Sequence, residues 1–234
     1  MNDVQYGGTG RTSDARTDRR RPLAGWAAAA VVLIAVAVLR EVLLAVTSWR
    51  DYLLIHDYIN GAATEADLEA ADTDVLTTVV SSVAAMFVVW IAAGVPFLVW
   101  LWRARVNAEA IGGRDSQRRA RLWVVGAWTS PVANLWYPYQ VVSDIWQASA
   151  PRLRASATLV KAWWVCYLLA QLVKPIQWRM ASGEWGGEQD ALSSAYVTTL
   201  LSALLLAAGV LLILVIRQVT AWQTEAPGTA GGGR

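Results

Sequence analysis

The side chains that most often carry enzymatic chemistry are scarce in this sequence. His56 is the only histidine and Cys166 the only cysteine among 234 residues. A histidine dyad, a histidine-based metal cluster and an intrachain disulfide are therefore excluded within one chain. The sequence also lacks a Gly-x-Ser-x-Gly motif, a P-loop and any metal-ligand spacing. We therefore expect no enzymatic activity, no catalytic or metal-binding residue and no cofactor.

Carboxylates are the remaining candidates for chemistry, and most of those in the first half of the chain lie in residues 50–74. Their density could bind a cation, but the segment has no Asp-x-Asp-x-Asn-Gly loop, so we interpret it as a solvated acidic face. A short helix is expected from Thr64, a plausible N-cap, with Glu65 and Asp67 in its first turn. Elsewhere Glu109 and Asp144 are too isolated to suggest a membrane-embedded lipid enzyme.

Long uncharged runs must position these residues. The chain is 56% hydrophobic and only 16% charged, whereas globular proteins carry about 25% charge. Runs of this length predict an all-α integral membrane protein with four transmembrane helices. The predicted spans are 23–47, 75–102, 159–178 and 192–216. The second should be kinked by Gly94 and Pro96, and the third is long enough only if Lys161 and Lys174 reach opposite surfaces.

Two charged residues interrupt the first span. Arg40 and Glu41 are adjacent, about 100° apart around a helix, so they are not expected to face each other. We expect both side chains to extend to water rather than to form an ion pathway. Together with Lys174, they are the few ionisable residues within the predicted spans. Their small number counts against the alternative function of a small-solute or ion transporter or channel, and the glycines and prolines of the second and third spans keep that alternative open.

Charge alternates between the segments that flank the spans. The tail 1–22, predicted to be disordered, and the loops 103–121 and 152–161 are basic, whereas the loops 50–74 and 184–190 are acidic. Positive segments stay in the cytoplasm, so four crossings of the plasma membrane with both termini inside satisfy every loop. A fifth crossing within the membrane domain 23–217 would reverse the later loops. The tail 218–234 is predicted to be disordered and cytoplasmic.

The uncharged segment 122–148 is therefore predicted not to cross, and it either re-enters or lies flat on the cytoplasmic side. Residues 122–130 would form a helix of only about 13 Å, ended by Pro131. Pro138 is suited to begin a second, amphipathic helix. Tyr139, Val142, Ile145 and Trp146 share its apolar face, which we expect to lie in the acyl boundary of the membrane.

Asn134 lies between the two prolines of this segment. Prolines leave backbone carbonyls unpaired, which is costly at membrane depth, and Asn134 is the obvious side chain to pair with them. We therefore expect Asn134→Leu to destabilise the protein. Unchanged thermal stability of this variant in detergent would contradict the expectation.

The spaced tryptophans and prolines resemble a known family. The pattern runs Trp100-x-x-Arg103-x-x-x-Asn107-Ala108, then Trp128-x-x-Pro131-x-x-Asn134-Leu135-Trp136-x-Pro138, then Trp146 and Trp163-Trp164. It is similar to the domain-of-unknown-function family numbered 4328, over roughly residues 75–214. The resemblance implies a multi-pass membrane protein of a kind found mostly in actinobacteria, and it implies no activity, substrate or cofactor. Trp128, Pro131, Trp136, Pro138 and Trp146 are interpreted as structural anchors and helix breakers.

The same residues also suggest a binding groove on the cytoplasmic side. It would be formed by Arg103, Asn107, Asn134, Tyr137, Tyr139 and Gln140. Basic pockets in this position bind anionic lipid head groups, and a partner peptide is the other candidate ligand. We therefore expect a structural or interaction protein that engages lipids or partner proteins and no nucleic acid. The stripe Ala195, Thr199, Ala203 and Ala207 is predicted to pack a neighbouring helix, within the chain or in a homo-oligomer.

Overall fold

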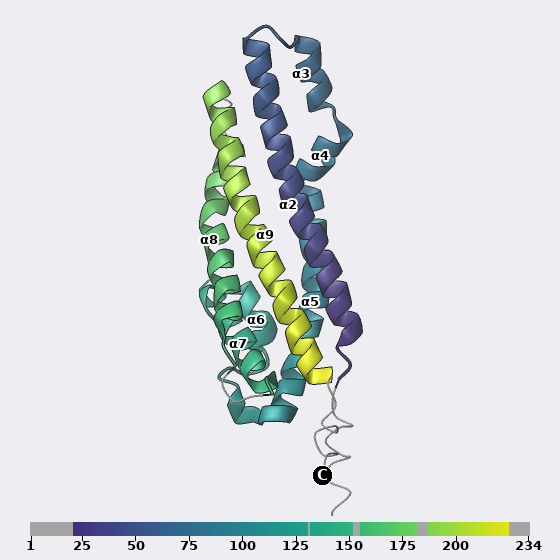
Figure 1. The fold of residues 1–234 in the computed structure, drawn as a ribbon, viewed down its shortest axis with the longest axis vertical. Helices are drawn as coiled ribbons and strands as arrows, with labels where there is room; N and C mark the ends of the chain where they lie inside the picture. The colour runs from purple at the N-terminus through teal and green to yellow at the C-terminus, as the bar shows by residue number, and fades with distance from the viewer. Residues whose placement is uncertain (1–20, 131, 152–154, 182–186, 225–234) are drawn as a thin grey trace, which may run out of the picture. The chain divides into compact units, whose positions relative to one another are not determined.

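The computed structural model describes residues 21–130, 132–151, 155–181 and 187–224, and the described residues form helices and no strands (Figure 1). The long helices are α2 (Ala24–Ile59), α5 (Val83–Gly112), α8 (Thr158–Ala181) and α9 (Glu188–Thr224). The shorter ones are α3 (Glu65–Asp72), α4 (Val75–Ser81), α6 (Trp123–Thr129) and α7 (Tyr137–Ser149), with 3-10 turns η1 (Arg114–Ser116) and η2 (Ala133–Leu135). The all-α prediction is confirmed.

Four of these helices are long and apolar enough to cross a membrane. They are Ala24–Ile59, Val83–Gly112, Thr158–Met180 and Glu188–Thr224. With 36 and 37 residues, α2 and α9 are about 54–56 Å long, well beyond the ~30 Å hydrocarbon core. The prediction of four helices that could cross a membrane is thus confirmed, and α9 differs from the prediction at its end. It continues through Thr224, where we expected a disordered tail from 218.

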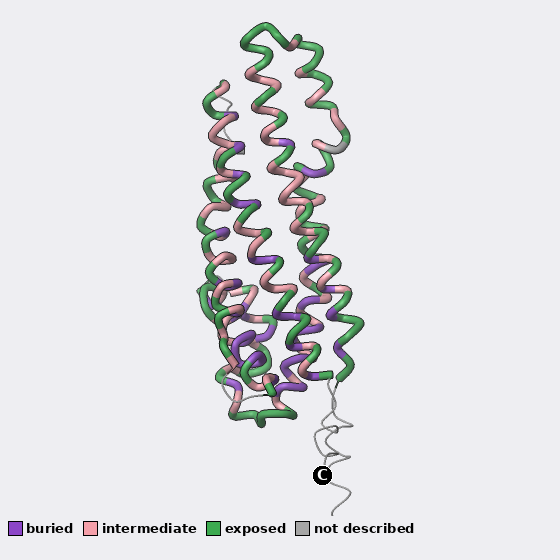
Figure 2. The backbone as a smooth tube through the Cα atoms, viewed as in Figure 1, coloured by how far each residue is buried: buried purple, intermediate pink, exposed green. Residues whose placement is uncertain are grey.

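The chain divides into two compact units. Unit 1 contains the described residues of 1–25, 98–155 and 218–234, and unit 2 contains those of 26–97 and 156–217. Unit 2 therefore holds most of the long apolar helices, and unit 1 holds the segment 122–148. In unit 1 the backbone of α7 is mostly buried, whereas the long helices of unit 2 carry exposed residues along their length (Figure 2).

Within unit 2, α2 and α9 pack as antiparallel neighbours (Figure 1). Trp49 Nε1 donates to Thr199 Oγ1 at 2.8 Å, and His56 Nδ1 lies 2.6 Å from Glu188 Oε1. Residue numbers rise along α2 as they fall along α9. Within unit 2, the start of α2 therefore lies at the same end as Arg217 of α9. Large apolar side chains stay exposed on the outside, as membrane lipid requires. Examples are Val32, Leu39, Val88, Ile91, Leu172 and Leu200.

The small-residue stripe of α9 is only partly used for packing inside the chain. Ala195 is buried, but Thr199 and Ala203 are exposed. The buried face instead includes Ala195, Thr198, Ser202, Ala208 and Gly209. The homo-oligomer that the stripe suggested stays a prediction.

The second predicted span is two helices rather than one. Ser82 ends α4 with an extended backbone, φ −55° and ψ 128°, and its hydroxyl accepts the Ala85 N–H at 3.2 Å, as an N-cap of α5. Ser81 Oγ donates back to the Thr77 carbonyl at 2.7 Å, and such bonds compete with regular helix. Hydroxyl side chains thus interrupt an uncharged run. Beyond the break, α5 continues through Pro96.

The acidic segment 50–74 contains the expected short helix. Thr64 precedes α3, and its N–H and hydroxyl both donate to the Asp67 carboxylate at 2.8 and 2.7 Å. Asp74 caps α4 by accepting the Thr77 N–H at 3.0 Å. Two of the acidic side chains therefore organise helix starts, which is a structural role.

Candidate functional site

The polar centre of unit 1 is the side chain of Arg105, on the last turns of α5. It is only 3% exposed and each of its nitrogens has an acceptor. Nε donates to Glu109 Oε1 at 2.8 Å, Nη1 to Gln117 Oε1 at 2.7 Å, and Nη2 to the Arg119 carbonyl at 2.6 Å. A buried guanidinium satisfied in this way fixes the loop 113–121 against α5.

Glu109 links this buried arginine to the surface. Its carboxylate is 7% exposed and accepts from Arg105 on one oxygen. On the other it accepts the Arg121 Nε at 2.9 Å and Nη2 at 2.5 Å. These hydrogen bonds raise the pKa of Arg121 above its ordinary value. Arg121 itself is 44% exposed, so one face of its guanidinium is held and the other meets solvent.

Asp144, on α7, holds a second surface arginine in the same manner. Its side chain is 8% exposed and accepts the Arg118 backbone N–H at 2.9 Å and the Arg118 Nε at 2.8 Å. Gln117 Nε2 also reaches the Asp144 carbonyl at 3.3 Å. The Arg118 side chain stays 55% exposed. The arginine loop is therefore tied to α7 as well as to α5.

Arg119 is held by two of the residues predicted to line a groove. Its Nε donates to Gln140 Oε1 at 2.8 Å, and its guanidinium carbon lies 4.1 Å from the centre of the Tyr137 ring. Both contacts stabilise the start of α7 against the loop, the second as a cation–π interaction. Tyr139 is half-buried in the same turn.

Two other predicted groove residues hold the segment that leads into α2. Asn107 Oδ1 accepts the Arg21 N–H at 2.8 Å, and Asn107 Nδ2 donates to the Arg21 carbonyl at 3.0 Å. One turn earlier on α5, Arg103 Nη1 donates to the Pro22 carbonyl at 3.0 Å. Four of the six predicted residues are thus brought together in two pairs, Tyr137 with Gln140 around Arg119 and Arg103 with Asn107 around residues 21–22. The groove stays a prediction.

Asn134 lies in η2, where its backbone N–H donates to the Ser130 carbonyl at 2.8 Å. Its side-chain Oδ1 is buried and accepts no hydrogen bond from the described residues. Asn134 was expected to pair with the backbone carbonyls that the two prolines leave free. Pro131 lies outside the described residues. The expectation for Asn134→Leu stays a prediction.

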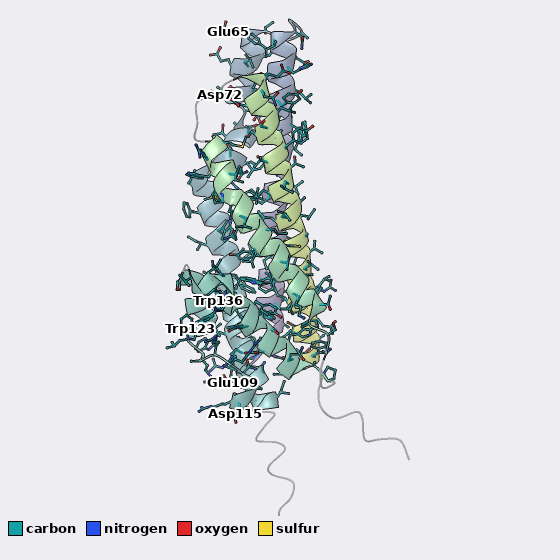
Figure 3. All side chains as sticks on the ribbon, turned by 90° about the vertical axis from the view of Figure 1, so that its left-hand side faces the viewer. Glu65, Asp72, Glu109, Asp115, Trp123 and Trp136 are labelled. Carbon is teal, nitrogen blue, oxygen red and sulfur yellow. The ribbon has the colours of Figure 1, made fainter. Side chains whose placement is uncertain are left out.

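The other motif residues lie in or beside α6 and α7. Pro138 is buried in the first turn of α7, as predicted, and Trp128 is half-buried in α6. Trp146 is 6% exposed and meets the Trp222 ring edge-on at 4.6 Å, whereas Trp136 is 45% exposed. Figure 3 labels Trp123 and Trp136 with Glu109 and Asp115, all in unit 1.

The apolar face of α7 corrects one prediction. Val142, Ile145 and Trp146 are buried by protein, so this face does not lie in the acyl boundary. The polar face is largely buried too, because Asp144 binds the loop and the Ser149 hydroxyl accepts Gln223 Nε2 at 2.6 Å. Gln223 Nε2 also donates to the Ala104 carbonyl at 3.0 Å, joining α9 to α5. The helix is a core element of unit 1, at 13 residues too short to cross a membrane.

Sequence reasoning missed the residues at the centre of this arrangement. Arg105 and Glu109 are four apart, the spacing of a helical ion pair, and that signal was available. Gln117 and the role of Asp144 depend on contacts that no local pattern reveals. The set formed by Arg105, Glu109, Gln117, Arg118, Arg119, Arg121 and Asp144 is called the arginine cluster below.

The arginine cluster suits anion binding better than acid–base chemistry. Both of its carboxylates accept hydrogen bonds from guanidinium groups and so are already occupied. Arg114, Arg118 and Arg121 carry exposed side chains, and we call these three the arginine surface. Among the described residues, no group of three or more His, Cys, Asp or Glu could hold a metal ion.

Comparison with known protein families gives a match over most of the chain. The model of the family described as domain of unknown function (DUF4328) matches residues 60–221. This range is wider at both ends than the 75–214 covered by the tryptophan and proline pattern. No curated protein and no solved structure matches the chain at a significant level.

Proposed function

The chain belongs to the DUF4328 family, and on this premise we propose that it is a plasma-membrane protein whose arginine surface binds the phosphate groups of anionic lipids. The family brings no activity with it, so the proposal rests on geometry. The observation that carries it is the way two buried carboxylates, Glu109 and Asp144, hold Arg121 and Arg118 with part of each guanidinium in solvent. Arginines fixed in this manner lose little freedom on binding a ligand.

The composition of this region supports a phosphate ligand. Residues 98–155 contain eight arginines, no lysine and three acids, a net charge of +5. Arginine binds phosphate through two parallel N–H groups, whereas lysine acts as a single point charge. The eight residues are Arg103, Arg105, Arg114, Arg118, Arg119, Arg121, Arg152 and Arg154.

The charge distribution supports a cytoplasmic position for the arginine surface. The end of unit 2 where α2 ends and α9 begins carries acids, including Asp57, Glu188 and Asp190. Segments rich in arginine remain in the cytoplasm and acidic ones follow no such rule, so the proposed orientation places both termini inside. The cytoplasmic leaflet is also the one rich in anionic lipid.

The proposal predicts selective loss of lipid binding in Arg114→Gln/Arg121→Gln. Binding of short-chain phosphatidylglycerol and phosphatidylcholine to the full-length protein is measured in zwitterionic detergent. We expect phosphatidylglycerol to bind more tightly, and the double variant to weaken it roughly 10- to 30-fold, at about 1 kcal/mol per arginine. Phosphatidylcholine binding should not change.

The matched control is Arg50→Gln, which removes one exposed arginine from the acidic side of unit 2, where it lies 3.8 Å from Asp74. Its phosphatidylglycerol affinity should equal that of the wild type. Equal affinities for the two lipids in the wild-type protein would contradict the proposal. If a protein co-purifies instead and is lost in the double variant, the arginine surface binds a partner protein.

A further inference from the structure

A second cluster of charged residues lies within unit 2, among the long helices. Arg40 and Glu41 on α2 have side chains only 10% and 12% exposed, so neither extends to water as we expected. They also contact each other despite being adjacent, with Arg40 Nη1 donating to Glu41 Oε1 at 3.0 Å. Lys174 on α8 has its ammonium 4.0 Å from the centre of the Trp90 ring.

A hydrogen bond and the interaction between their charges place these residues at one level. Lys174 is close enough to Glu41 and Arg40 to interact with both charges. Ser202, on α9, donates its hydroxyl to the Glu41 carbonyl. Gln171 lies one turn before Lys174, on the same face of α8. We call Arg40, Glu41, Gln171 and Lys174 the intramembrane cluster.

The intramembrane cluster lies within the predicted membrane region. Lys174 is 13 residues from Lys161 along α8, about 20 Å, and Ser202 is 15 residues from Arg217 along α9, about 22 Å. If Lys161 and Arg217 mark one surface of a ~30 Å core, the cluster lies in its far third. Charged groups at such depth are costly unless paired, and they commonly mark ligand or ion sites.

The pairing inside the cluster is incomplete. Two cations and one carboxylate leave an excess of one positive charge. Arg40 Nε is buried and has no hydrogen-bond partner among the described residues, and Gln171 Oε1 is likewise buried without one. Arg40 differs in this respect from Arg105 in unit 1, because every nitrogen of the buried Arg105 guanidinium has an acceptor. Arg40 thus retains a donor that a ligand can use.

We infer that the intramembrane cluster binds one small monovalent anion, such as chloride, between Arg40 and Lys174. A single negative charge neutralises the excess, whereas a divalent anion would leave an unpaired negative charge in an apolar region. The Arg40 Nε–H and the Lys174 ammonium donate to the anion, and the Gln171 amide can turn its NH₂ toward it. Glu41 keeps Arg40 oriented and limits the site to one charge.

The test measures thermal stability and chloride binding of the full-length protein in detergent. Sodium chloride is compared with sodium gluconate at equal ionic strength, because gluconate has the same charge but is much bulkier. We expect chloride to raise Tm in a saturable manner, by roughly 3–6 °C at ten times its Kd. Calorimetric titration of the wild type should give one site per chain.

Three variants are expected to respond differently to chloride. Lys174→Met leaves Arg40 and Glu41 as a neutral pair, so its Tm should not respond to chloride. Glu41→Gln raises the excess charge to two and should increase the chloride response. Lys161→Met removes an exposed lysine from the first turn of α8 and should respond as the wild type does.

The wild-type titration alone can overturn the inference. Equal Tm in chloride and gluconate, with no calorimetric binding, would do so even if Lys174→Met failed to fold. A chloride response that persists in Lys174→Met would place the anion elsewhere and overturn it too. Lys174→Arg, which keeps the charge, should retain the response.

Discussion

Glu109→Gln is expected to lower the free energy of unfolding by about 3 kcal/mol. The side chain is 7% exposed and is shared by Arg105 and Arg121, and removing one partner of a buried ion pair costs about 3–5 kcal/mol. Glutamine keeps one oxygen as an acceptor, so we expect a loss of stability at the lower end of this range. For a chain of this size the loss corresponds to a fall in Tm of roughly 6–12 °C. Thermal unfolding in detergent, followed by tryptophan fluorescence, measures it.

The matched control is Glu69→Gln, the same chemical change on the exposed surface of α3. Its Tm should stay close to that of the wild type, because surface substitutions usually change stability by less than about 0.5 kcal/mol. The double variant Arg105→Met/Glu109→Gln should be less destabilised than the sum of its single variants, since the uncompensated charge is gone. Equal Tm values for Glu109→Gln and Glu69→Gln would show that the pair contributes nothing.

The contacts of the arginine cluster also explain why α7, in the segment 122–148, is buried by protein. The sequence pattern around Pro131 and Pro138 predicted two short helices separated by a turn, and α6, η2 and α7 confirm it. An amphipathic pattern reports which side chains need apolar surroundings, but it does not distinguish lipid from protein. Val142 and Ile145 have protein around them because α7 is bound through Asp144 to the loop and through Ser149 to α9.

The transmembrane helices were predictable because hydrocarbon imposes a length and an absence of charge. The break at Ser82 was not, because a hydropathy pattern carries no information on hydroxyl groups that bond to the backbone. The arginine cluster joins residues 12 and 26 apart in sequence, Arg121 to Glu109 and Arg118 to Asp144. No periodicity reports such contacts, since they arise from tertiary packing.

Arg40 shows another limit of prediction from the sequence. Helical geometry argued that adjacent side chains diverge, and the length of the arginine side chain allows the contact with Glu41 nonetheless. The intramembrane cluster then depends on α2, α5, α8 and α9 meeting at one level. That arrangement requires the close approach of α2 and α9, which can be tested directly.

Gly209 is the residue of α9 that permits this approach. A Cβ at this position would overlap Val38 Cγ2 on α2 and touch Ile34 Cγ2 at 3.8 Å. The valine side chain is stiff and cannot move aside within its helix. Gly209→Ala should therefore separate α2 from α9 and cost about 1–3 kcal/mol, measured as a fall in Tm in detergent.

Gly94→Ala is the matched control, because nothing lies within 4 Å of a Cβ at Gly94. There alanine should leave Tm unchanged or raise it, by the ~1 kcal/mol that separates alanine from glycine in a helix. Val38→Ala/Gly209→Ala should recover part of the stability lost in Gly209→Ala, since the overlapping methyl group is removed. If Gly209→Ala and Gly94→Ala have the same Tm, α2 and α9 are not in close contact at this level. The hydrogen bond from Ser202 to Glu41 would then lose its structural basis.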